Sequence, residues 1–211
     1  MKLFLVSQWL LPEFRLAFEQ LVGKPLSQTS VVLIENGADD EPYERSWVKN
    51  TRNSLLDAGM TVTQLDLRSY AGGKDNERLR TVLSDADVIW VGGGNTFYLN
   101  WILEDSGARD LIVRMVKDGK IYAGGSAGAI VAGPTISGFE TADDVSFAPK
   151  LVADGMALTD IVVLPHWGGE HYGAIMERIA KQLATTGRIV QPLTDREALI
   201  VDGVLKRVIT A

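Results

Sequence analysis

Short apolar runs alternate along the chain with longer segments in which apolar residues recur at helical spacing. The runs are residues 2–6, 30–38, 60–67, 86–94, 120–125 and 160–167. Their largely apolar character is typical of strands that are covered on both faces. Helical spacing marks residues 41–59, 76–85, 96–107, 108–120 and 172–187. This alternation predicts a mostly parallel sheet with helices on both sides.

The C-terminal stretch "EALIVDGVLKRVITA" departs from this alternation. It holds two short β-prone runs on either side of Asp202–Gly203, which is a hairpin signal. We expect an antiparallel pair at one end of the sheet. Internal repeats, low-complexity tracts and linkers are absent from the sequence, so a single domain over residues 1–211 is the simplest expectation.

The charge and composition of the chain argue against several kinds of partner and site. The 211 residues carry a formal net charge of −6, which argues against nucleic acid as a partner because phosphate binding needs a basic face. The chain has no cysteine, so disulfides, thiolate metal sites and a cysteine nucleophile are excluded. The two histidines, His166 and His171, have no suitably spaced carboxylate pair for a zinc site. We therefore expect neither a metal nor a cofactor.

The first residues of the chain predict a strand followed by a helix. Trp9, Pro12, Glu13 and Arg15 interrupt the apolar start soon after it begins, which disfavours a signal peptide. No apolar run reaches the length of about 18 residues that a membrane span needs. We expect a cytoplasmic protein without membrane contact. The sequence leaves open whether the chain forms a homo-oligomer.

The stretch "GGSAG" surrounds Ser126 at the junction between a predicted strand and a predicted helix. A nucleophile elbow requires small neighbours here, because side chains flanking the serine would clash in the sharp turn. The N–H groups at the start of the helix, such as that of Ala127, can stabilise an oxyanion. The structural alternative is a close-packed turn in which the serine has no chemical role.

A second glycine-rich loop, "VGGGNTFYL" at residues 91–99, ends another predicted strand. It lacks the spacing of a phosphate-binding loop or of a dinucleotide fingerprint. Sites in open α/β sheets form at the carboxyl ends of the strands, so this loop can supply an oxyanion donor next to Ser126. The alternative is a tight strand-to-helix connection that Asn95 or Thr96 caps.

His166 follows the apolar run at 160–167 and is therefore expected at the same edge of the sheet as Ser126. Imidazole is the usual base for a serine nucleophile near neutral pH. His171 lies in a polar segment and is expected to be exposed. The base also needs an orienting acid, and spacing alone does not choose among the candidates. These are Glu140, Asp143, Asp144, Glu170, Asp195 and Glu197.

Taken together, "VGGGNTFYL", "GGSAGAIVAGPTI" and "LPHW" resemble the peptidase E group of S51 serine peptidases, over about residues 86–200. This group includes aspartyl dipeptidases and cyanophycinases. The resemblance implies a flavodoxin-like three-layer sandwich, akin to class I glutamine amidotransferase domains. It places the family's serine on Ser126, its histidine on His166 and its oxyanion donors on Gly93 and Ala127.

The family's acid, a glutamate, aligns with Asp195 in "TDREALIV". Aspartate is shorter by one methylene, so Glu197, Asp143 and Asp144 remain alternatives. The resemblance implies a serine peptidase that acts on short peptides.

The segment after His166 offers only Arg178 and Lys181 as cations, so strict preference for an N-terminal aspartate does not transfer. An esterase or amidase with the same residues, or a catalytically silent binding module, is the alternative function.

Overall fold

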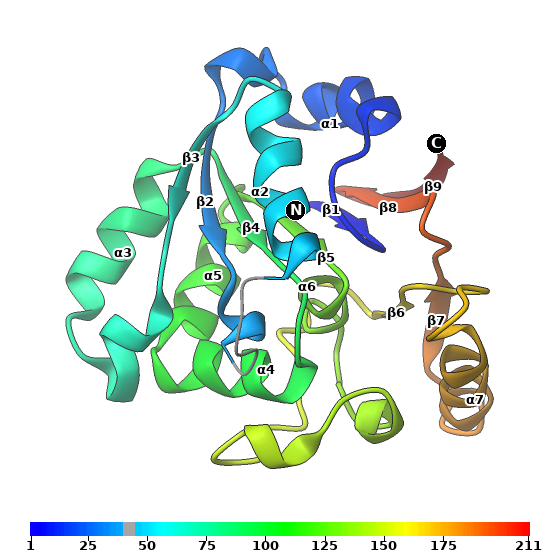
Figure 1. Cartoon of the computed structure of the whole chain (residues 1–211). Helices are drawn as coiled ribbons and strands as arrows, with labels where there is room; N and C mark the ends of the chain where they lie inside the picture. The colour runs from blue at the N-terminus through cyan, green and yellow to red at the C-terminus, as the bar shows by residue number, and fades with distance from the viewer. Residues whose placement is uncertain (40–44) are drawn as a thin grey trace.

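The computed structural model describes residues 1–39 and 45–211, and its main feature is a seven-stranded sheet (Figure 1). The strand order is β3-β2-β4-β5-β1-β8-β9. The five strands from β3 to β1 are parallel, whereas β8 and β9 run antiparallel to their neighbours. The strands of this sheet are β1 (Lys2–Val6), β2 (Ser30–Ile34), β3 (Thr61–Gln64), β4 (Val88–Val91), β5 (Ile121–Gly125), β8 (Glu197–Asp202) and β9 (Leu205–Thr210).

Seven α-helices and six short 3-10 helices connect the strands in the described residues. The α-helices are α1 (Arg15–Val22), α2 (Ser46–Asp57), α3 (Asn76–Asp85), α4 (Thr96–Asp105), α5 (Ala108–Lys117), α6 (Ala127–Ile130) and α7 (Gly173–Ala184). The 3-10 helices are η1 (Pro12–Phe14), η2 (Leu26–Gln28), η3 (Asn36–Ala38), η4 (Leu67–Gly73), η5 (Phe139–Thr141) and η6 (Val145–Phe147). The predicted helix at 41–59 begins at Ser46 in the described part, and residues 41–44 of that prediction lie outside it.

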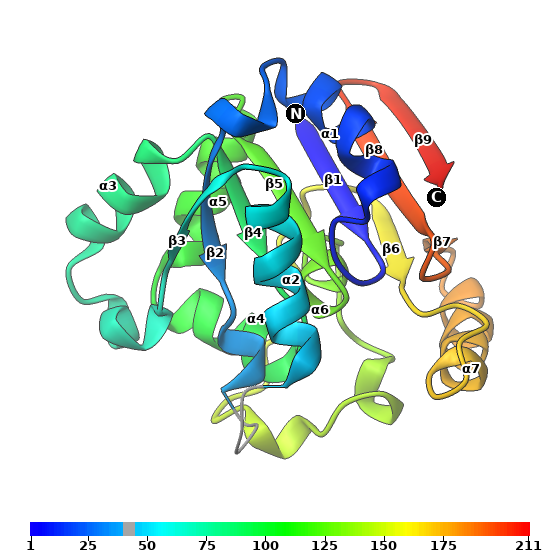
Figure 2. The same ribbon diagram turned by 45° about the horizontal axis from the view of Figure 1, so that its top comes forward.

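Two apolar clusters pack on opposite faces of the sheet, because successive side chains of a strand point to opposite sides. In β1, Phe4 and Val6 join the cluster under α1 and α2, which lie in front of the sheet in Figure 2. Leu3 and Leu5 join the larger cluster under α3, α4, α5, α6 and α7. The arrangement is the three-layer sandwich that the sequence predicts, and the expected C-terminal hairpin is confirmed as β8–β9.

One strand does not lie where the sequence pattern predicts. The apolar run before His166 forms β6 (Ile161–Leu164), which pairs in parallel with β7 (Ile189–Pro192) as a separate two-stranded sheet. All four residues of β6 are buried and belong to the larger cluster. A strand covered on both sides has the same apolar pattern in either sheet, which is why the pattern does not reveal the separation.

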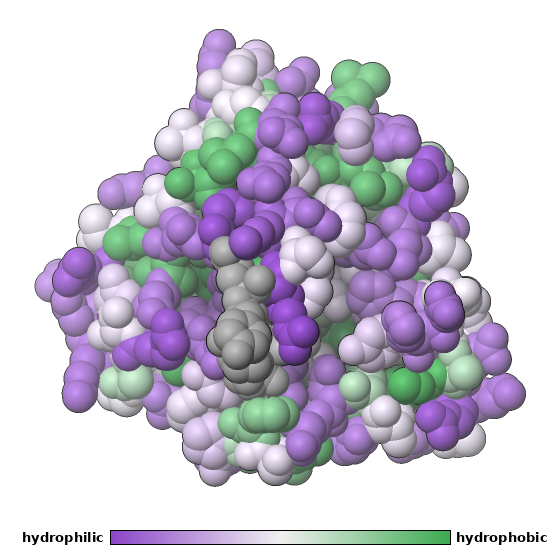
Figure 3. All heavy atoms as spheres, in the orientation of Figure 1, coloured by the Kyte–Doolittle hydropathy of each residue, from purple (hydrophilic) through white to green (hydrophobic). Residues whose placement is uncertain are grey.

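Hydrophilic residues predominate on the face drawn in Figure 3, and the apolar residues there form small separate patches. Scattered apolar residues of this kind are ordinary on a water-facing surface. Among the helices of the described residues, none combines the length and the hydropathy that crossing a membrane requires.

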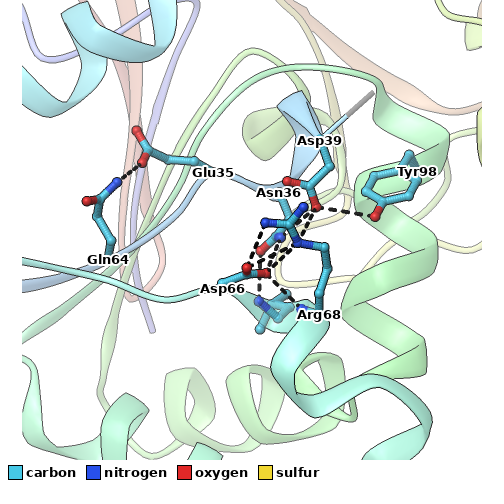
Figure 4. A network of polar contacts seen from close by, with 8 residues as sticks. Glu35, Asn36, Asp39, Gln64, Asp66, Arg68 and Tyr98 are labelled. Atoms are coloured by element: carbon cyan, nitrogen blue, oxygen red, sulfur yellow. Dashed lines mark hydrogen bonds and ion pairs between the residues drawn. The ribbon is translucent and has the colours of Figure 1, made fainter. Parts of the chain in front are cut away.

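A polar network ties the ends of β2 and β3 to α4 (Figure 4). The buried Asn36 donates from Nδ2 to Asp39 Oδ2 at 2.7 Å and to Asp66 Oδ1 at 3.0 Å. Arg68 pairs with Asp66 at 2.7 Å, and the Tyr98 hydroxyl donates to Asp39 at 3.2 Å. Hydrogen bonds from Arg68, followed by those from Asn36, lower the pKa of Asp66 to about 2.

This network supports the second glycine-rich loop through η3. Asn36 Oδ1 also accepts a hydrogen bond from Leu67 N, so the side chain of Asn36 is bound on both of its polar atoms. The next residue, Gly37, accepts a bond from Asn95 N at 2.7 Å through its carbonyl. A Cβ atom on Gly94 would lie 2.0 Å from that carbonyl oxygen, so only glycine allows this contact.

We predict that Asn36→Asp destabilises the protein by about 2–4 kcal/mol at pH 7, because it removes two charge-assisted donors and adds a third carboxylate. Urea unfolding measures the change. Asn53→Asp, the same substitution on an exposed position of α2, is the control and should stay within about 0.5 kcal/mol. The penalty of Asn36→Asp should shrink as falling pH protonates the carboxylates. Equal stability of the two variants would show that the Asn36 network contributes little to the free energy of unfolding.

Candidate active site

Ser126 lies at the turn from β5 to α6 with a backbone φ of 52°. This conformation is costly for a residue with a side chain and persists only where its surroundings enforce it. Close packing around the turn enforces this conformation, because even a Cβ atom on Gly128 would lie 2.1 Å from Val91 O. Ser126 N also donates to Val6 O at 3.2 Å, which fixes the turn to the end of β1. The turn has the strand–serine–helix form of a nucleophile elbow.

The histidine ring reaches the serine from the separate β6–β7 sheet. His166 follows β6 with a φ of 57°, and its Nε2 lies 2.9 Å from Ser126 Oγ. The backbone N–H of His166 donates to Ser7 Oγ at 2.7 Å, which ties this loop to the end of β1. Tyr172 lies beside the imidazole, with ring centroids 5.4 Å apart. The ring and the backbone of His166 are therefore positioned by neighbours from different parts of the chain.

Asp195 lies on the far side of the imidazole, with Oδ1 at 2.8 Å from His166 Nδ1. The Ser7 hydroxyl donates to the same oxygen at 2.7 Å. Burial alone would raise the pKa of Asp195, but hydrogen bonds from His166 and Ser7 hold it below its ordinary value. A carboxylate at this point selects the tautomer with hydrogen on Nδ1, which leaves Nε2 free to accept from Ser126.

Two backbone N–H groups border the serine. A Cβ atom on Gly93 would lie 3.1 Å from Ser126 Cβ, so the glycine loop and the elbow are in contact. No carbonyl oxygen among the described residues accepts a hydrogen bond from Gly93 N or Ala127 N. Free donors beside a nucleophile are what an oxyanion hole needs.

The remaining candidate acids do not contact the imidazole. Glu197 accepts from Thr194 N at 2.8 Å, Asp144 from Ser146 N at 2.8 Å and Glu140 from Gly138 N at 2.9 Å. Asp143 accepts from Thr96 N at 3.0 Å, and both Glu170 and His171 are exposed. Of the acids that the sequence left open, Asp195 is the one that the structure brings to His166.

Ser126 and His166 open into a cavity of about 370 Å³. Its walls combine aromatic and aliphatic side chains, such as Trp9, Trp47 and Met176, with polar groups near the serine. A cavity of this size and character suits a small ligand. In the described residues, no group of three histidine or acidic side chains is arranged to hold a metal ion. The arrangement brings together a serine hydroxyl, an imidazole, a carboxylate and unpaired backbone N–H groups, which are the types of group that acyl transfer uses.

Ser7 is a functional candidate that the sequence analysis missed. It is a buried polar residue directly after an apolar strand, at the carboxyl end of β1. Functional sites in parallel sheets lie at the carboxyl ends of the strands, so the position of Ser7 was the one feature of the sequence that pointed to a functional role. A lone serine after a strand is too common to be singled out, and its hydrogen bonds to His166 and Asp195 come from segments distant in sequence.

Comparison with known proteins assigns the family. The model of peptidase family S51 matches residues 11–209. The curated protein Lmo0363 of Listeria monocytogenes, described as an uncharacterized peptidase, is 33% identical over 78% of this chain and 77% of its own. Peptidase E of Citrobacter koseri is 37% identical over 83% of this chain and 71% of its own.

A solved structure agrees with these matches. The crystal structure of a Listeria monocytogenes EGD-e protein, provisionally assigned to peptidase E, superposes with a TM-score of 0.84 at 27% identity. The alignment covers 100% of this chain and 98% of that one. The family model, the curated relatives and the shared fold together lead to one conclusion. The chain belongs to peptidase family S51 and is a serine-type peptidase.

Proposed function

We propose that this peptidase hydrolyses short peptides through a triad of Ser126, His166 and Asp195. One observation carries the proposal: the uninterrupted chain of hydrogen bonds from Ser126 Oγ to His166 Nε2, at 2.9 Å, and from His166 Nδ1 to Asp195 Oδ1, at 2.8 Å. Nucleophile, base and orienting acid are each within hydrogen-bond distance, which is the geometric requirement for an activated serine.

Acylation begins when Ser126 Oγ attacks the scissile carbonyl carbon and His166 Nε2 takes the hydroxyl proton. The Gly93 and Ala127 N–H groups stabilise the negative charge that develops on the carbonyl oxygen. The imidazolium then donates its proton to the leaving amine, so the C–N bond breaks and an acyl-enzyme remains. Asp195 stays ionised and stabilises the positive charge on His166 throughout.

Deacylation repeats these steps with water as the nucleophile. His166 removes a proton from the water molecule that attacks the ester carbonyl of the acyl-enzyme. Collapse of the second tetrahedral intermediate returns the proton to Ser126 Oγ and releases the acid product. The same two N–H groups stabilise both oxyanions, so the peptide bond is hydrolysed without any other reactant.

The size of the cavity supports short substrates. A volume of about 370 Å³ accommodates one or two amino-acid residues rather than a folded protein segment. An esterase or amidase would use the same residues on another acyl group, and a silent binding module would turn over neither substrate. Parallel panels of dipeptides and short-chain esters distinguish these functions.

We predict that Ser126→Ala lowers kcat for peptide hydrolysis by about 10⁴-fold or more, because no other group can form the acyl-enzyme. Steady-state kinetics on the best dipeptide of the panel measures the loss. The variant should stay folded, as judged by its urea unfolding midpoint. Equal activity of the variant and the wild type would remove Ser126 from the mechanism.

We predict that Asp195→Asn lowers kcat by about 10²–10⁴-fold with little change in KM, since an amide favours the wrong imidazole tautomer without touching the substrate. Asp144→Asn is the comparison, because its side chain caps η6 and asparagine keeps that bond. The Asp144 variant should retain activity within a few-fold. If the Asp144 change is the crippling one, the acid is misassigned.

A further inference from the structure

We propose that Asp143 binds the free α-ammonium group of the substrate, and that the adjoining cavity takes an uncharged, apolar N-terminal side chain. This inference rests on the proposed function and makes the enzyme an exopeptidase that reads the amino terminus. Asp143 lies between η5 and η6, and it lines the same cavity as Ser126 and His166.

The carboxylate of Asp143 lies next to the oxyanion loop. Its Oδ2 accepts a hydrogen bond from Thr96 N at 3.0 Å, and Thr96 follows Gly93 by three residues. The α-amino nitrogen of an N-terminal residue is two bonds from the scissile carbonyl carbon. A group that binds it must therefore share the cavity with the oxyanion donors, and Asp143 lines that cavity together with Gly93 and Ser126. The cationic end of a lysine or arginine side chain would reach farther into the cavity.

Capping of α4 accounts for only one oxygen of this carboxylate, because Oδ2 accepts from Thr96 N, the first N–H of the helix. Asn95 already caps the helix, since its Oδ1 accepts from Tyr98 N at 2.9 Å. The fully buried Thr96 lines the cavity, and its hydroxyl lies beside the Asp143 carboxylate, where it lowers the pKa of Asp143 against the effect of burial. A carboxylate and a hydroxyl oxygen side by side can both accept hydrogen bonds from an ammonium group, which has three donors.

The charge of Asp143 has no counterion among the described residues. No arginine or lysine in the described part pairs with it, and its hydrogen bonds come from Thr96, an uncharged residue. Burial raises the pKa of Asp143, against the opposing effects of Thr96 and His166. A bound ammonium group would favour the ionised carboxylate and offset the cost of burying it.

The rest of the cavity disfavours an acidic side chain. In the described part of the chain, the lining includes Asp143 and Asp144 but no arginine or lysine. Arg178 and Lys181, the cations that follow His166 in sequence, are exposed on α7 and do not line the cavity. Trp47, Ile130 and Phe147 are among the side chains that form its apolar wall. An uncharged apolar first residue therefore fits better than aspartate or glutamate.

The test compares one peptide, Leu-Leu, with its N-acetylated form on the wild type and on two variants. We expect acetylation to lower kcat/KM of the wild type by about 10²-fold or more, because it removes a charge-assisted contact beside the reacting carbonyl. Asp143→Asn should lose a similar factor on the free peptide and discriminate little between the two forms. Glu140→Gln removes an exposed carboxylate of η5 and should retain the full discrimination.

The ratio of kcat/KM for Leu-Leu to kcat/KM for its N-acetylated form decides the inference. If the wild type cleaves both peptides equally, or if Asp143→Asn still discriminates as the wild type does, then Asp143 does not bind the ammonium group. Reaction with a fluorophosphonate probe separates this failure from failure of the proposed function. Asp143→Asn should be labelled at the wild-type rate, because the triad is intact. A wild type that resists the probe would instead overturn the proposed function.

Two further measurements bear on the same inference. Asp143→Asn keeps the acceptor for Thr96 N and removes an uncompensated charge, so its melting temperature at pH 7 should equal or exceed that of the wild type. A clearly lower value would give Asp143 a structural role in place of substrate binding.

Asp-Leu should be cleaved at least about tenfold less efficiently than Leu-Leu, since it brings a carboxylate into a cavity that already holds two. Preference for Asp-Leu would overturn the predicted side-chain class.

Discussion

The hydroxyl group of Ser7 joins two of the three parts of the candidate active site, the histidine loop and the acid. It accepts from the backbone N–H of His166 at 2.7 Å and donates to Asp195 Oδ1 at 2.7 Å. The preceding residue, Val6, accepts the N–H of Ser126. The end of β1 therefore holds the elbow of the main sheet and the histidine loop of the separate β6–β7 sheet in one place. This connection matters because no strand pairing links the β6–β7 sheet, which carries His166, to the main sheet, which carries Ser126.

Backbone strain concentrates where these parts meet. Ser126 and His166 both have positive φ angles, a conformation that costs free energy for residues other than glycine. Close contacts such as the one between Gly93 and Ser126 leave the chain no relaxed alternative. On the opposite side of the glycine loop, the Asn36 network fixes η3 against Gly94. Support from both sides holds Ser126 and the glycine loop in a fixed arrangement, which the proposed catalysis by preorganised groups requires.

The sheet, its flanking helices and the C-terminal hairpin were predictable, because alternating apolar runs and helical periodicity report directly on burial. Ser126 and His166 were predictable as strand-end residues of the types that acyl transfer needs. Asp195 depended on the family resemblance, since an aspartate in a polar turn has no pattern of its own. Ser7 and the separate β6–β7 sheet were not predictable, because both depend on contacts between segments far apart in sequence.

Covalent labelling tests the central claim, that Ser126 is the activated nucleophile of this peptidase, most directly. The measurement is peptide mapping by mass spectrometry after reaction of the native protein with a fluorophosphonate. The account predicts one phosphonylated site, Ser126, and loss of the adduct in His166→Ala, where the base is missing. Labelling of a different residue, or a Ser126 that stays unmodified while the protein hydrolyses peptides, would contradict it.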